Sequence, residues 1–120
     1  MKPYIVLLDR EAIPGELRIP AFDHIWVEHP RTAPGECADH LWRATIGVTC
    51  AVPVGRADIA GCPKLQLFIV TGPDAAIVDT SACRERGIRI SHLPPDGRSA
   101  QARADTLMDR IEAFVCGGNV

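Results

Sequence analysis

Five short apolar runs, separated by stretches with helical spacing, constrain the fold of this 120-residue chain more than any other feature. The runs lie at residues 4–8, 24–28, 44–49, 65–70 and 88–90. Helical spacing of apolar residues occurs at 36–43, 57–60, 80–86 and after Ser99. Buried strands that alternate with helices indicate βα units and a parallel sheet. We therefore expect an α/β fold: a flavodoxin-like doubly wound parallel five-stranded sheet, in the order 2-1-3-4-5, with a C-terminal helix.

Capping residues mark the ends of the predicted helices. Asp79 is predicted as the N-cap of the helix at 80–86, and Gly87 as its C′ residue. Ser99 is predicted to cap the last helix. The remaining boundaries are predicted at Pro94-Pro95, which would end the fifth strand, and at Gly117-Gly118, which would close the last helix.

The last helix carries an apolar stripe formed by Leu107, Met108, Ile111, Phe114 and Val115. A helix with such a stripe must bury it. Two interpretations stay open: the stripe folds back on the chain's own sheet, or it packs on the same helix of a second subunit, by exchange across Asp96-Gly97-Arg98. The second is favoured, because an uncovered stripe would be sticky. We therefore expect a main unit at 1–95, a helical unit at 96–120 and a homodimer formed through that helix.

Composition and charge exclude several classes of partner. The net charge of −2 and the absence of a basic cluster argue against binding of nucleic acid. The apolar run at 4–8 is too short for a signal peptide, and no stretch approaches the roughly 20 apolar residues of a membrane span. The five cysteines include no C-x-x-C pair, which favours buried thiols over disulfides, and no histidine has metal-ligand spacing. We expect a cytoplasmic protein without a metal and without a membrane contact.

The turn Thr71-Gly72-Pro73-Asp74 follows the most apolar run, at a position where α/β proteins often bind a ligand. It is not a nucleotide loop, because no two glycines of the chain stand two residues apart and Pro73 lacks a backbone donor. The amides of a turn can nevertheless bind an anion. Cys50 and His92 follow the expected third and fifth strands and would face the same crevice. The candidate substrate-binding residues are therefore Thr71, Gly72, Cys50 and His92.

The other polar and aromatic residues of note are interpreted as structural. Asp9 and Arg10 end the first strand and are expected to be solvated. Trp42 follows Leu41 on a predicted helix and is expected in the core. The remaining histidines are expected as partly exposed polar residues at His24, His29 and His40.

The segment PKLQLFIVTGPDAAIVDTSACRERGIRIS, with LLDREAIP near the start and VPV at 52–54, resembles the substrate-binding domain of NAD-dependent D-2-hydroxyacid dehydrogenases, and is most similar to the glycerate dehydrogenase branch. The resemblance covers about residues 3–95, and the last helix resembles the family's interdomain helix. It implies that Thr71 and Gly72 offer backbone contacts to a substrate carboxylate. The chain departs from the family pattern at Ala75 and His92, where the family has Asn, and by two extra residues before Val78.

The catalytic Arg, Glu and His of that family, and its glycine-rich loop, belong to a second, NAD-binding domain and cannot be placed in these 120 residues. We therefore expect a stand-alone, non-catalytic relative that has no cofactor of its own and binds a small carboxylate or a protein. A second hypothesis is half of a dehydrogenase whose separate partner chain supplies NAD. A third is an independent small enzyme that uses His92 or Cys50. Whether the chain is an enzyme stays open at this point.

Overall fold

A five-stranded parallel sheet forms the centre of the computed structural model, which describes residues 2–93 and 97–117. Its strands lie in the order β2-β1-β3-β4-β5, and every neighbouring pair is parallel. The predicted fold class and strand order are therefore confirmed. The strands are β1 (Tyr4–Leu7), β2 (Ile25–Glu28), β3 (Ile46–Thr49), β4 (Leu67–Val70) and β5 (Arg89–His92).

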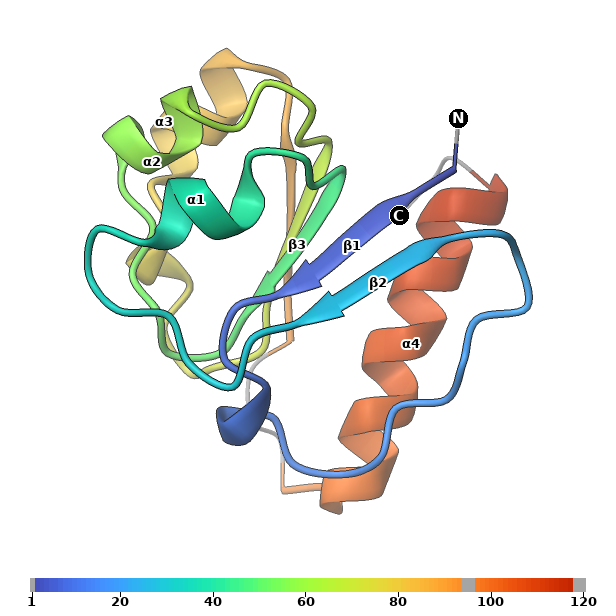
Figure 1. The fold of residues 1–120 in the computed structure, drawn as a ribbon. Coiled ribbons are helices and arrows are strands. Elements are labelled where there is room, and N and C mark those ends of the chain that lie inside the picture. The colour runs from blue at the N-terminus through green and yellow to red at the C-terminus, as the bar shows by residue number, and fades with distance from the viewer. Residues whose placement is uncertain (1, 94–96, 118–120) are drawn as a thin grey trace.

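The helices cover the two faces of the sheet unequally (Figure 1). Three short helices lie on one face: α1 (Cys37–Leu41), α2 (Arg56–Ala60) and α3 (Thr80–Glu85). The long helix α4 (Ala100–Gly117) covers the other face, and two 3-10 turns, η1 (Arg10–Ala12) and η2 (Ala75–Ile77), follow β1 and β4. Along β4, Phe68 and Val70 join the core under the short helices, whereas Leu67 and Ile69 join the core under α4. This alternation explains why the strand is apolar on both sides.

The predicted caps are formed as expected. The Asp79 carboxylate accepts a hydrogen bond from the Ala82 amide at 2.9 Å, and the Ser99 hydroxyl accepts one from the Ala102 amide at 3.1 Å. Gly87 has φ +72°, a left-handed conformation in which glycine is favoured after a helix. The predictions that fall on Pro94, Pro95, Asp96 and Gly118 lie outside the described residues.

The apolar stripe of α4 is buried against the chain's own sheet. Leu107, Met108 and Ile111 are at most 1% exposed. They share a core cluster with Ile5, Leu7, Ile46, Val48, Leu67 and Ile69. The first of the two open interpretations of the stripe therefore describes this structure, and the need to cover the stripe no longer argues for a dimer. The homodimer stays a prediction, but burial of the stripe is no longer a reason for it.

The loop between β1 and β2 runs along α4 on the same side of the sheet (Figure 1). Arg18 of this loop forms ion pairs with Asp109 and Glu112 of the helix at 2.7 and 2.5 Å. Gly15 packs so closely on Ala100 that a Cβ there would lie 2.8 Å from its carbonyl oxygen. The loop and the helix thus form one layer.

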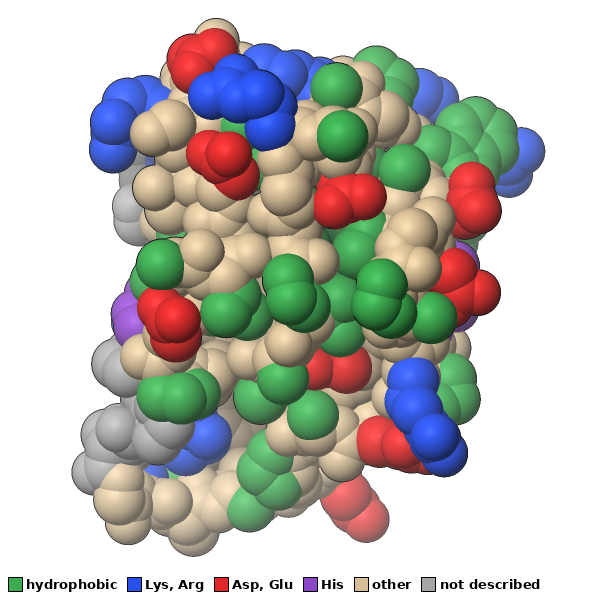
Figure 2. Space-filling model, turned by 90° about the vertical axis from the view of Figure 1, so that its left-hand side faces the viewer, with side chains coloured by type: hydrophobic (Ala, Val, Ile, Leu, Met, Phe, Trp, Pro, Cys, Tyr) green, Lys and Arg blue, Asp and Glu red, His purple; other side chains and the backbone are tan. Residues whose placement is uncertain are grey.

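Figure 2 shows the opposite face, formed by the three short helices, where lysine and arginine side chains lie mainly along the upper edge. Trp42 is 49% exposed and Arg43 stacks on its ring at 4.4 Å, so the prediction that Trp42 lies in the core is wrong. Leu41 occupies the core instead, because consecutive helical residues point about 100° apart.

Within the described residues, no helix is both long enough and apolar enough to cross a membrane.

Two histidines stack on each other at the carboxyl edge of the sheet. The rings of His29 and His40 lie 3.6 Å apart with their planes 1° from parallel. Burial lowers the pKa of His29, a positive charge on His40 lowers it further, and Glu36 raises it. The unfolded chain therefore binds more protons than the native state below about pH 6.5, where a free histidine titrates.

We expect the stability contributed by this pair to be complete above about pH 6.5 and to be lost as the pH falls toward the lowered pKa of His29. Replacing His29 with Gln should flatten the dependence of the unfolding free energy on pH between about 7.5 and 5.5, measured by urea denaturation. The comparison variant replaces His24, a histidine outside the stack, with Gln. Equal slopes for all three proteins would contradict the prediction.

Candidate functional site

The four residues predicted from the sequence meet at the carboxyl edge of the sheet. Cys50 follows β3, Thr71 and Gly72 follow β4, and His92 is the last residue of β5 rather than a residue after it. His92 belongs to the strand because its register pairs it with Val70. The edge is where a doubly wound sheet offers its ligand crevice.

Gly72 is required by space and not by backbone conformation. A Cβ at this position would lie 2.1 Å from the carbonyl oxygen of Cys50, far inside van der Waals contact. The loop after β4 can therefore touch the loop after β3 only because residue 72 has no side chain. The sulfur of Cys50 lies next to the same turn, 3.7 Å from that Cβ position.

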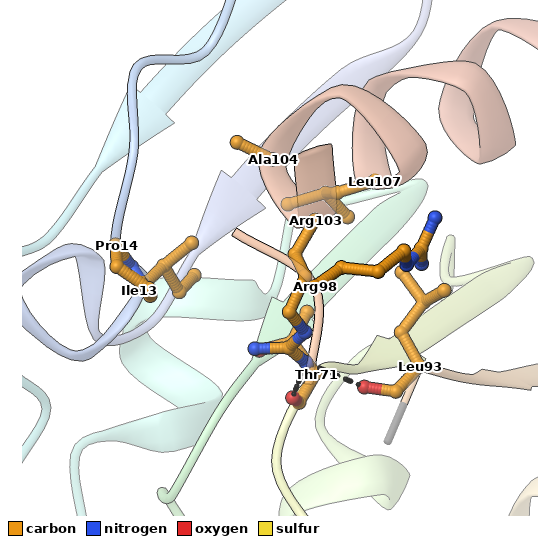
Figure 3. Close-up of a pocket in the computed structure, with 8 residues that line it drawn as sticks. All are labelled: Ile13, Pro14, Thr71, Leu93, Arg98, Arg103, Ala104 and Leu107. Atoms are coloured by element: carbon orange, nitrogen blue, oxygen red, sulfur yellow. Dashed lines mark hydrogen bonds between the residues drawn. The ribbon is translucent and has the colours of Figure 1, made fainter. Parts of the chain in front are cut away.

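Both carbonyl groups of the Thr71-Gly72 turn are held by side chains. His92 donates from Nε2 to the Gly72 oxygen at 2.8 Å, which fixes the Nε2–H form of its ring. Arg103 of α4 donates from Nη2 to the Thr71 oxygen at 2.8 Å and to the Leu93 oxygen at 2.9 Å (Figure 3). These bonds fix the orientation of two successive peptide groups at the turn.

The amide of Gly72 is the donor that this arrangement presents. In a trans peptide the N–H points away from the preceding carbonyl, so the Gly72 amide lies on the side opposite Arg103. Among the described residues, no acceptor is bonded to this amide. A buried turn that holds its carbonyls and leaves an amide unpaired can bind an anion.

The Thr71 hydroxyl is buried without a partner. Thr71 is 7% exposed, and by strand alternation its side chain lies on the α4 side, like Ile69. Within the described part of the chain, its Oγ1 is the one buried side-chain polar atom that has no hydrogen bond. Such an atom costs about 1–3 kcal/mol unless a bound molecule satisfies it.

Asp9 accepts hydrogen bonds from the backbone amides of the neighbouring loop after β3, a role that the sequence analysis missed. Its carboxylate is 6% exposed and accepts from the Cys50 amide at 2.9 Å and the Ala51 amide at 2.8 Å, so the prediction that it is solvated is wrong. Burial raises the pKa of Asp9, and the two amide bonds oppose this rise. The chain's own carboxylate therefore occupies the two amides of the loop after β3, which leaves the amide of Gly72 in the loop after β4 as the candidate donor for an external anion. The signal in the sequence is an acid placed directly after the apolar run at residues 4–8.

Among the described residues, no nucleophile–base pair forms at this edge. No hydrogen bond joins Cys50 to His92 among the residues described. Burial raises the pKa of Cys37 and Cys62, each to about 11, so both thiols stay protonated near neutral pH. Across residues 2–93 and 97–117, no three His, Cys, Asp or Glu side chains come together as metal ligands.

Comparison with known proteins supports the resemblance predicted from the sequence. No family model matches the chain. Glycerate dehydrogenase of Methylorubrum extorquens is 29% identical over 94 residues, which are 78% of this chain and 30% of that protein. The fold matches 3-phosphoglycerate dehydrogenase of Entamoeba histolytica, with a TM-score of 0.61 and 13% identity over 77% of this chain and 33% of that one. It also matches the pyruvate reductase of Chlamydomonas reinhardtii, with a TM-score of 0.60 and 13% identity over 78% and 30%.

The strand order and the helices on both faces define an α/β fold, which is the fold of the matching part of these two solved structures. More particularly, the chain resembles the D-2-hydroxyacid dehydrogenases, and the curated likeness is to glycerate dehydrogenase. The chain spans about a third of the length of the proteins it matches. Both solved structures are less than 25% identical to this chain, so the comparison with them shows similarity of fold only.

Proposed function

We propose that this protein binds a small carboxylate at the carboxyl edge of its sheet, as a non-catalytic relative of the D-2-hydroxyacid dehydrogenases. The observation that carries the proposal is the Gly72 amide, which has no acceptor among the described residues while both carbonyls of its turn are held. Glycerate, 3-phosphoglycerate and pyruvate, named in the proteins it resembles, are all small carboxylic acids. A cytoplasmic location and a homodimer remain proposals beside it.

A second candidate is one half of a dehydrogenase that acts with a separate NAD-binding chain. The likeness to a part of glycerate dehydrogenase favours it. The residues of this chain do not fit the nucleotide, because no glycine pattern for a phosphate loop is present and Pro73 interrupts the donors of the turn. Hydride transfer requires a nicotinamide held against the substrate, so a partner would have to supply that half of the cleft.

Titration with glyoxylate or hydroxypyruvate is expected to shift the backbone amide resonance of Gly72, with a dissociation constant of about 1 mM or weaker, as a site with few contacts allows. Glycolamide, which lacks the charge, is the control ligand and should produce no shift. Shifts confined to other loops would reject the site. In a parallel calorimetric titration, micromolar binding of NADH by the pure chain would contradict the non-catalytic proposal, and it would also contradict the second candidate, which assigns the nucleotide to a separate chain.

A further inference from the structure

A small apolar pocket lies between the end of β4 and the first turns of α4 (Figure 3). Its innermost volume is about 20 Å³, enough for a methyl or ethyl group, and the pocket is partly open to solvent. The pocket draws on four separate parts of the chain. Its lining is Ile13, Pro14, Thr71, Leu93, Arg98, Arg103, Ala104 and Leu107.

Arg103 places a positive charge at this pocket, together with N–H donors that form no hydrogen bond to a described residue. A guanidinium has five N–H groups, and the two bonds from Nη2 to the carbonyls of Thr71 and Leu93 use two of them. Within the described residues the other three have no acceptor. Figure 3 shows a second terminal nitrogen of Arg103 pointing toward the side of the pocket where Ile13 and Pro14 lie.

Arg98 plays a different part in the same pocket. Its guanidinium donates from Nη1 to the Thr106 hydroxyl at 3.1 Å, and Figure 3 shows its head turned away from Ile13. The aliphatic part of the Arg98 side chain therefore lines the pocket, whereas Arg103 places its guanidinium group there. The unpartnered Thr71 hydroxyl belongs to the same lining, at the strand end that Arg103 caps. A buried hydroxyl without a partner beside free guanidinium donors is the pattern expected where a bound anion completes the hydrogen bonds.

We propose that this pocket is a second ligand site, selective for an acyclic monocarboxylate of two or three carbons. The methyl or ethyl end enters the aliphatic lining, and the carboxylate accepts charge-assisted hydrogen bonds from Arg103 and completes the bonding of Thr71. The site is separate from the one at the Gly72 amide, because the carbonyl and the N–H of the Thr71-Gly72 peptide point to opposite sides. The small volume at the bottom of the pocket disfavours longer chains.

Methyl-labelled protein titrated with acetate, propionate and hexanoate at constant ionic strength tests the proposal. Acetate and propionate should shift the methyl resonances of Ile13 and Leu107, and hexanoate should bind on the order of tenfold more weakly. Replacing Arg103 with Gln should weaken acetate binding on the order of tenfold. Replacing Arg84, an exposed arginine on α3, removes the same charge far from the pocket and should leave binding unchanged.

Arg103 also joins two loops, so a second variant that keeps this residue separates ligand binding from folding. Ile13→Val enlarges the pocket by one methylene and should raise the affinity for butyrate relative to acetate by about threefold. The proposal is overturned if the two methyl groups do not respond to acetate, or if chloride gives the same shifts without any dependence on chain length. The Gly72 amide reports the site of the proposed function and these methyl groups report the pocket, so failure of one is distinguishable from failure of the other.

Discussion

Replacing Leu107 with Asp is expected to abolish the native fold. Leu107 is 1% exposed in the middle of α4, where it packs on the sheet with Met108 and Ile111. Truncating such a leucine costs about 2–5 kcal/mol, and burying an unpaired carboxylate adds several more. The sum approaches the whole stability of a domain, about 5–15 kcal/mol. Circular dichroism and urea denaturation at neutral pH measure the loss.

Ala113 provides the matched control, because it is exposed on the same helix. Ala113→Asp should change the unfolding free energy by no more than about 1 kcal/mol. A Leu107→Asp variant that remained folded as a monomer, with a wild type that is a dimer in light scattering, would contradict this prediction. That pair of results would instead show that the stripe is an interface between two copies of the chain.

The parallel sheet could be predicted because such a sheet buries both faces of its strands, and the strand order then followed from the flavodoxin-like fold class. The run from Leu67 to Val70 is apolar at every position, and all four side chains are buried. Such a run fits a strand that is buried on both faces, as in a layered α/β fold. The caps at Asp79 and Ser99 were predictable for a related reason, since a cap depends on residues that are at most three positions away.

Features that depend on distant parts of the chain could not be predicted in the same way. The stripe of α4 shows that the helix is buried, but not which surface covers it. Asp9 bonds to amides 41 and 42 residues away, and Arg103 bonds to a carbonyl 32 residues away. No local pattern contains these pairs. The sequence therefore located the turn of the candidate site, while the groups that orient the turn and fill its neighbour became visible only in the fold.

Replacing Gly72 with Ala is expected to destabilise the protein by about 3 kcal/mol and to abolish carboxylate binding at the turn. The new Cβ would stand 2.1 Å from the Cys50 carbonyl oxygen, which belongs to the backbone and cannot rotate away. The two loops must separate, and the bond from His92 to the Gly72 oxygen then loses its geometry. Urea denaturation measures the first effect, and titration with glyoxylate measures the second.

Gly55 is the matched control, since a Cβ there would meet only the Asp58 carboxylate, at an ordinary 3.7 Å. Its φ of −95° also suits alanine, so Gly55→Ala should alter the unfolding free energy by less than about 1 kcal/mol and leave the affinity for glyoxylate unchanged. Equal stability of the Gly72 and Gly55 variants would show that the loops after β3 and β4 do not approach as described. A Gly72 variant that is destabilised but still binds glyoxylate with wild-type affinity would instead remove the Gly72 amide from the site, because a displaced turn could not hold the anion in the same place.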